Sequence, residues 1–203
     1  MYFNLPGLVL PPRRRAPDPG GAAMRPGPGE VLHFSEDPGI TRFVPHVAAT
    51  AQRPEAYVWA VNAVRAPDYW FPRQCPRAMA WLKPGTTSAD RDLVLGPGGG
   101  TRVHAIEYRW LDALRTVTLY AYRLPAAAFA PLGEPRPHAR VATEPVLPLG
   151  PPEPAGSLLQ LHEEASIQLR VLPNLWPFWD TVVTTTLAWS GIRLRNAAPR
   201  PAG

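Results

Sequence analysis

The stretch "VLHFSEDPGITRFVPHV", residues 31–47, decides where the folded part of the chain begins. It opens on apolar and aromatic residues around His33, continues through the polar run "SEDPG", and ends in a second apolar stretch that carries His46. Short runs of β-branched and aromatic residues, bounded by Pro, Gly and Asp, are typical of strands. We therefore expect "VLHF" to be the first core strand and "SEDPG" its polar exit. His46, which follows Pro45, is expected to face water.

The same pattern recurs along the rest of the chain. Strands are predicted at "EAYVWAV" (55–61), "RAMAWL" (77–82), "DLVL" (92–95), "RVHAIEY" (102–108), "VTLYAYRLP" (117–125), "ARVATEPVLPL" (139–149) and "SIQLRVLP" (166–173). Helices are predicted at "WLDALRT" (110–116), at "SLLQLHEEA" (157–165), and over 174–191, where Asn174 caps a helix that Gly191 ends. These elements predict a single α+β domain with a mixed, mostly antiparallel and split sheet, a few short helices, and a C-terminal helix packed on the sheet.

The two ends differ from this body. Residues 1–29 are rich in Pro, Gly and Arg and predict a disordered extension, and a translation start at Met24 would remove most of it. Residues 30–197 are predicted to be the domain, and 198–203 a disordered tail. Residues 1–29 and 191–203 each carry a charge of +3, so with a total of +5 the body between them sums to −1 and is close to neutral. A near-neutral body disfavours a nucleic-acid-binding surface, which relies on clustered phosphate contacts.

Several familiar sites are absent from the sequence. The glycine run "GPGGGT" (96–101) lacks the lysine of a phosphate-binding loop, the five histidines have no metal-ligand spacing, and no GxSxG occurs. No apolar run is long enough to cross a membrane. The lone Cys75 excludes an intrachain disulfide, and a cytoplasmic location is the simplest expectation. Arg73 and Arg77 flank Cys75, and their charges would lower the pKa of its thiol, which makes a thiol enzyme one alternative.

Six blocks carry a resemblance: "LHFSED", "VWAV", "FPRQCPRAMAW", "LYAYRLP", "PNLW" and "SGIRLRNA". In this order they resemble a family of uncharacterised bacterial proteins known only as a domain of unknown function. The resemblance covers about residues 30–197. It implies a shared fold and no particular activity.

The order of a few polar residues also resembles the ADP-ribosyltransferase-like fold of the His-Tyr-Glu type. That fold has a split antiparallel sheet with a His on the first strand, aromatics after the second and a Glu on a late strand. The resemblance implies that His33 holds the ribose of NAD, that Tyr69 or Tyr57 stacks on the nicotinamide, and that Glu144 steadies the ribose hydroxyl.

This assignment has a chemical basis. Breaking a glycosidic carbon–nitrogen bond builds positive charge on the ribose, so a nearby carboxylate stabilises the transition state. A planar guanidinium from Arg73 or Arg77 suits the pyrophosphate, and Ser35 adds a hydroxyl beside His33. The expected function is therefore an ADP-ribosyltransferase-like transferase or glycohydrolase, or an inactive relative that binds NAD or a related nucleotide. The alternatives are a non-catalytic module that binds nucleic acid or protein, and a thiol enzyme that uses Cys75.

Overall fold

The computed structural model describes residues 24–47, 55–133 and 137–201 of the 203-residue chain. The strands are β1 (Glu30–Ser35), β2 (Val58–Ala60), β3 (Arg77–Trp81), β4 (Arg102–Glu107), β5 (Tyr120–Pro125), β6 (Ala130–Leu132), β7 (Ala139–Ala142), β8 (Glu153–Pro154), β9 (Ile167–Leu172) and β10 (Ala188–Ile192). The helices are α2 (Ser88–Val94), α3 (Leu111–Thr116), α4 (Leu158–Glu164) and α5 (Trp176–Val182). Short 3₁₀ turns join them, among them η1 (Ala66–Tyr69), η2 (Gly96–Gly98) and η5 (Leu194–Asn196).

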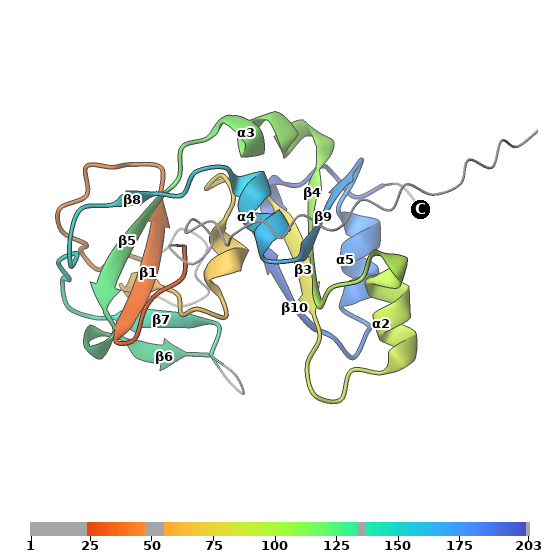
Figure 1. Ribbon diagram of the computed structural model, residues 1–203, viewed down its shortest axis with the longest axis horizontal. Helices are drawn as coiled ribbons and strands as arrows, with labels where there is room; N and C mark the ends of the chain where they lie inside the picture. The colour runs from red at the N-terminus through yellow and green to blue at the C-terminus, as the bar shows by residue number, and fades with distance from the viewer. Residues whose placement is uncertain (1–23, 48–54, 134–136, 202–203) are drawn as a thin grey trace, which may run out of the picture.

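The described strands form three sheets that fall into two groups. The sheets β1–β5–β8 and β2–β7–β6 are joined by a bridge between Leu32 and Val61, and they lie on one side of the molecule (Figure 1). The four-stranded sheet β10–β3–β4–β9 lies on the other side, with α2 and α5 next to it (Figure 1). Every strand pair is antiparallel except β4 with β9. The predicted α+β class is confirmed, and so is the mostly antiparallel arrangement.

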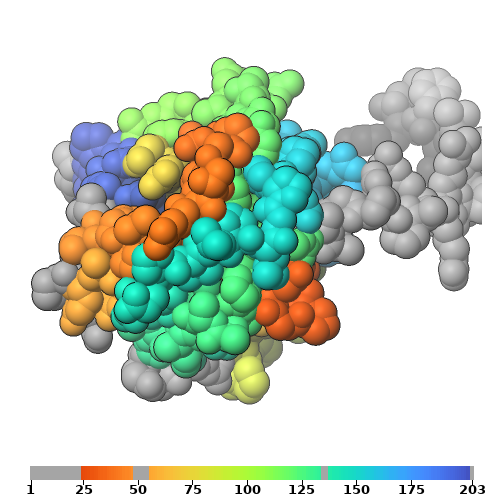
Figure 2. Space-filling view, turned by 90° about the vertical axis from the view of Figure 1, so that its left-hand side faces the viewer, coloured from red at the N-terminus to blue at the C-terminus, as the bar shows by residue number. Residues whose placement is uncertain are grey.

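Apolar side chains from both groups fill the space between them. The largest buried cluster joins Leu32 of β1 and Ala121 of β5 to Ile106 of β4 and to Leu158 and Leu161 of α4. Burial of apolar surface is the main favourable term in folding, so this shared cluster holds the two sheet groups together as one body. Figure 2 shows the outer face of the first group, where residues 24–47 lie against the segment around Val146, to which Phe43 is bridged.

The ordered structure starts earlier than the sequence predicts. Met24 is buried, with an exposed fraction of 2%, and it belongs to the largest core cluster. Arg25 donates a hydrogen bond to the carbonyl oxygen of Ala63 at 2.8 Å. The predicted boundary at residue 30 is therefore too late, because residues 24–29 already contribute to the core. The rest of the predicted extension, residues 1–23, lies outside the described residues.

Two further elements differ from the prediction. Residues 92–95, predicted as a strand, lie in and just after α2, because Thr87 caps this helix by accepting a hydrogen bond from the Asp90 backbone N–H. The glycine run therefore joins a helix to β4 rather than two strands. The predicted helix over 174–191 stops at Val182, and its last residues form β10. The hydroxyls of Thr184 and Thr185 bond back to helix carbonyls in the turn that separates the two elements.

Candidate functional site

A cavity of about 890 Å³ lies between the two groups of sheets. One wall is formed by β1, β2 and the start of β7, and the other by η1, the segment that leads into β3, and the turn after β10. Its size is within the range of small-molecule and cofactor sites. The polar and aromatic side chains that line it include His33, Tyr57, Trp59, Tyr69, Arg73 and Arg77.

His33 occupies the β1 wall in a defined protonation state. Its Nδ1 lies 2.7 Å from the carbonyl oxygen of Trp59, and because a carbonyl only accepts hydrogen bonds, Nδ1 carries the proton. Burial lowers the pKa of His33 to about 4, although the hydrogen bond to Trp59 opposes the shift. The ring is therefore neutral at neutral pH, and its Nε2 is a hydrogen-bond acceptor. None of the described residues supplies a partner for Nε2.

Aromatic rings form much of the remaining surface. Tyr57 and Trp59 meet edge to face, with ring centres 5.8 Å apart, on the same side of the cavity as His33. Across from them lie Tyr69, the last residue of η1, and Phe71, two residues further along the chain. Burial raises the pKa of the Tyr69 phenol, while the charge of Arg77 opposes the rise. The phenol therefore stays neutral over the physiological range, and the cavity offers flat apolar faces on two sides.

Arg77 is a buried cation at the edge of these rings. Its exposed fraction is 3%, and its guanidinium lies 5.5 Å from the ring centre of Tyr69 and 5.1 Å from that of Phe71. Its Nε donates to the carbonyl oxygen of Asp68 and its Nη1 to that of Cys75, at 2.7 and 2.9 Å. Burial lowers the pKa of Arg77, but from so high an ordinary value that the group remains charged.

Three other arginines line the cavity near Arg77. Arg73 precedes β3, whereas Arg193 and Arg195 lie on the turn after β10. Arg193 has a positive φ of 57°, which is uncommon for a residue other than glycine and marks a backbone held in place by its surroundings. Burial lowers the pKa of Arg193, and the charges of Arg195 and Arg73 lower it further, which places these groups close together. Within the described chain, none of the four forms an ion pair with a carboxylate.

The cavity gathers most of the predicted site but not all of it. His33, Tyr57, Tyr69, Arg73 and Arg77 line it together. Two predicted members lie elsewhere, and each has a structural reason for its position.

Glu144 does not lie on a strand and is not a lining residue, because β7 ends at Ala142 and the chain bends outward before Pro145. Pairing resumes only at Val146, which is bridged to Phe43. Glu144 is exposed. Ser35 is buried at the end of β1, where its hydroxyl accepts a hydrogen bond from the Asp37 backbone N–H, so it shapes the turn after the strand.

The environment of Cys75 differs from the one that its neighbours in sequence indicate. Burial raises the pKa of its thiol to about 12, and the charge of Arg77 only partly opposes this shift. Its Sγ lies 3.5 Å from the carbonyl oxygen of Pro76, and Cys75 is not a lining residue of the cavity. The expected lowering of the pKa is wrong, because the removal of the thiol from water outweighs the nearby charge.

Sequence reasoning missed several lining residues. His46, expected to face water, is exposed but also contributes to the rim of the cavity, where its backbone pairs with that of Tyr57. Trp59 was expected only as part of a strand, and its indole nitrogen is buried without a hydrogen-bond partner in the described structure. Arg193 and Arg195 were counted only as part of a basic end. The block "SGIRLRNA", which carries both arginines, is the one signal that could have pointed to them.

Comparison with known proteins gives a family and no activity. The model of a family described as "Family of unknown function (DUF6886)" matches residues 32–197, which confirms the resemblance seen in the six sequence blocks. No curated protein matches the chain, and no solved structure matches it. In the described ranges, no helix has both the length and the apolar character needed to cross a membrane.

Proposed function

The chain belongs to this family of unknown function, and we propose that its cavity binds NAD or a related nucleotide, as in an ADP-ribosyltransferase-like enzyme or an inactive relative. The observation that carries the proposal is the meeting of His33, the two tyrosines and the arginines around one cavity of suitable size. These residues come from segments that are distant in sequence. Each offers a chemistry that one part of such a nucleotide needs.

The ribose is assigned to His33. A ribose hydroxyl can donate a hydrogen bond, and the neutral His33 ring presents its Nε2 as an acceptor because Nδ1–H is already engaged by Trp59. The nicotinamide or adenine ring is assigned to Tyr57 or Tyr69, whose faces provide a stacking surface. The diphosphate is assigned to the arginines, since guanidinium groups pair with phosphate oxygens in a bidentate manner.

Transfer of ADP-ribose is the second part of the proposal. It requires a carboxylate that stabilises positive charge on the ribose, a role that sequence reasoning gave to Glu144. Because Glu144 lies outside the lining, its contribution would require a rearrangement on binding. Release of nicotinamide from NAD, measured for the wild type and for Glu144→Gln, separates an active transferase or glycohydrolase from an inactive relative.

The unpaired Cys75 is in keeping with a cytoplasmic location, where thiols stay reduced.

Thermal unfolding with NAD, ADP-ribose and nicotinamide tests the binding step. A ligand present at about 100 times its Kd adds about 2.7 kcal/mol to the free energy of unfolding, which raises the Tm of a domain of this size by about 5–10 °C. We expect such a rise with NAD or ADP-ribose. The absence of a shift with every nucleotide would contradict the proposal.

Two substitutions of His33 form a matched pair. His33→Asn places an amide N–H near the position of Nδ1, so it retains the bond to Trp59 but removes the Nε2 acceptor. His33→Gln places an oxygen near the position of Nε2 but loses the bond to Trp59. We expect the Asn variant to fold normally and to lose most of the ligand-induced shift, whereas the Gln variant retains part of it. Equal ligand-induced shifts in the wild type and the Asn variant would show that His33 does not bind the nucleotide.

A further inference from the structure

The four arginines of the cavity belong to two segments that are far apart in sequence. Arg73 and Arg77 lie on the segment that enters β3, and Arg193 and Arg195 lie on the turn between β10 and the end of the chain. Four like charges that converge on one space repel one another, and pairing with carboxylates would be the usual compensation. In the described part of the molecule none of the four guanidinium groups forms an ion pair. Compensation is limited to the Glu36 carboxylate, which accepts a hydrogen bond from the Arg73 backbone N–H at 2.7 Å, and to the attraction of Arg77 by Asp68. Other contacts must therefore hold the two segments together.

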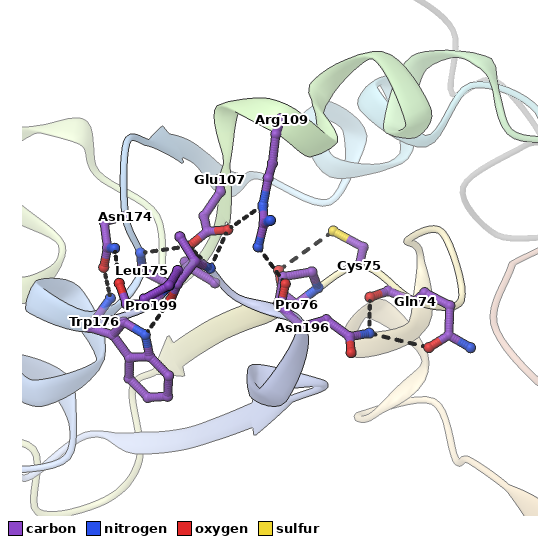
Figure 3. Close-up of polar contacts among 11 residues, drawn as sticks. Gln74, Cys75, Pro76, Glu107, Arg109, Asn174, Leu175, Trp176, Asn196 and Pro199 are labelled. Carbon is purple, nitrogen blue, oxygen red and sulfur yellow. Dashed lines mark hydrogen bonds and ion pairs between the residues drawn. The ribbon is translucent and has the colours of Figure 1, made fainter. Parts of the chain in front are cut away.

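Asn196 fastens the two segments directly. Its Nδ2 donates hydrogen bonds to the carbonyl oxygen and to the side-chain Oε1 of Gln74, at 2.8 and 3.2 Å (Figure 3). Gln74 follows Arg73, and the next carbonyl, that of Cys75, receives the Nη1 of Arg77. One side chain thus links the turn that carries Arg193 and Arg195 to the loop that carries Arg73 and Arg77.

Glu107 anchors the same turn from the far side. Its carboxylate is buried at the end of β4, with an exposed fraction of 1%, and it accepts hydrogen bonds from the backbone N–H of Ala198 and of Leu175. It also accepts from Arg109, whose guanidinium donates to the carbonyl oxygen of Asn196 (Figure 3). The segment predicted as a disordered tail is therefore tied down at least as far as Ala198, and the arginines before it are held before any ligand arrives.

Arg77 has hydrogen-bonding capacity that an anion could fill. It is more than nine-tenths buried, its Nε and Nη1 are engaged by backbone carbonyls, and the described residues give its Nη2 no hydrogen-bond partner. The buried Asp68 carboxylate attracts this guanidinium, but Asp68 is already ion-paired with two other arginines, Arg65 and Arg102. An anionic ligand would add negative charge and supply the acceptor that Nη2 lacks.

We infer that Arg73, Arg77, Arg193 and Arg195 form a preassembled site for a diphosphate group, and that Asn196 is the positioning residue that keeps its two halves in register. A diphosphate suits this arrangement because it carries more oxygens and more negative charge than a single phosphate, and its two phosphoryl groups can each meet one of the two segments. The inference deepens the proposed function, since it rests on the nucleotide site for its biological ligand. Inorganic pyrophosphate tests it alone.

Calorimetric titration of the full chain with inorganic pyrophosphate and with inorganic phosphate is the experiment. We expect pyrophosphate to bind at least about tenfold more tightly than phosphate, because it engages both segments. Arg193→Gln removes a charged hydrogen-bond donor and should weaken pyrophosphate binding at least about tenfold. If Arg193→Gln does not fold, Arg195→Gln replaces it, because Arg195 is exposed and its substitution leaves the core intact.

Asn174→Ala is the matched control for Asn196→Ala. Asn174 also bonds the C-terminal segment, because its Nδ2 donates to the carbonyl oxygen of Pro199, while its Oδ1 accepts from the backbone N–H of Trp176 in α5 (Figure 3). No hydrogen bond links Asn174 to Gln74. Loss of either amide should lower the Tm. Only Asn196→Ala should weaken pyrophosphate binding, and equal weakening in both variants would refute the positioning role.

The results also separate this inference from the proposed function. If pyrophosphate binds in a manner that depends on Arg193 but NAD and ADP-ribose bind no better than pyrophosphate, the anion site stands and the nucleotide proposal fails. If ADP-ribose binds and Arg193→Gln leaves its affinity unchanged, the nucleotide proposal stands and the anion site fails. Failure of pyrophosphate to bind the wild type would overturn the inference outright.

Discussion

Acid should destabilise this protein through a buried pair of histidines, His104 on β4 and His162 on α4. Nδ1 of His104 lies 3.0 Å from Nε2 of His162, and both side chains are buried. Nδ1 of His162 lies 2.7 Å from the carbonyl oxygen of Leu158, and Nε2 of His104 accepts from the Nε of Arg102 at 2.8 Å. A carbonyl only accepts and a guanidinium only donates, so each proton in this row of hydrogen bonds, from Arg102 to the carbonyl of Leu158, has one possible position. Both rings are therefore neutral, and protonation of either one would set two donors against each other.

The size of the effect follows from the pKa of His162, which burial lowers to about 4. An unfolded histidine has a pKa near 6.5, so the unfolded chain takes up a proton that the folded chain refuses. The stabilisation is fully present above about pH 6.5 and is lost as the pH falls towards about 4. Linkage gives a loss of about 2.5 kcal/mol between about pH 7 and pH 4.5 from His162 alone. His104, whose pKa burial also lowers, adds to this loss.

Urea unfolding of the wild type and of His162→Gln across this pH range measures the contribution. The glutamine oxygen can still accept from His104, so the variant should fold, with a lower stability at neutral pH. Carboxylates and the histidines that do not contact His162 titrate in both proteins and cancel in the difference, whereas His104, which bonds to position 162, can contribute to it. We expect the two stabilities to approach each other by about 2.5 kcal/mol as the pH falls from about 7 to about 4.5. A stability difference that stays constant with pH would refute the protonation states assigned to the pair.

Three further predictions concern single residues. Gly191→Ala should destabilise the protein by about 1–3 kcal/mol in urea unfolding, because the new Cβ would lie 2.6 Å from Leu194 and 2.8 Å from the ring of Trp179. Unchanged stability would mean that these two side chains move aside without cost. At about pH 8, iodoacetamide should alkylate Cys75 at least about a hundredfold more slowly in the folded chain than in urea, because burial raises the pKa of the thiol to about 12. Equal rates in the two states would contradict its burial. Glu107→Ala should cost about 3 kcal/mol of stability in the same unfolding assay, because the buried N–H of Leu175 and the part-buried N–H of Ala198 lose their acceptor. A loss below about 1 kcal/mol would contradict that role.

Most of the longer strands were predictable from the sequence because they are short, apolar runs bounded by turn residues, whereas β6, β8 and β10 were not predicted as strands. β1, β3, β5 and β9 all lie where alternating or β-branched runs placed them. α2 was missed even though its signal was present, since Thr87 followed by Asp90 is an N-capping pattern that deserved more weight than the apolar run "DLVL". The Thr-rich end of the predicted C-terminal helix was the opposite error, because β-branched residues favour the turn and strand found there.

Local sequence context failed where burial decides the chemistry. Arg73 and Arg77 flank Cys75 and indicate an activated thiol, yet the fold removes the sulfur from water and raises its pKa. Glu144 was assigned by its order along the chain, and order does not specify which way a bend beside a proline turns. His33 does line the cavity, because β1 forms one of its walls, whereas its binding role stays a prediction.

The arginines show how a linear count of charge can mislead. Arg193 and Arg195 were counted with a basic end of the chain, which left a near-neutral body and a weak case for a nucleic-acid-binding surface. In the structure this end of the chain lies against the rest of the domain, because Asn196 bonds to Gln74 and the carboxylate of Glu107 accepts from the backbone N–H of Ala198. The charge of the two segments is then concentrated in one cavity, next to aromatic rings and a neutral histidine. A diphosphate site of the kind proposed above therefore needs no phosphate-binding motif in the sequence, because hydrogen bonds bring together arginines about 120 residues apart.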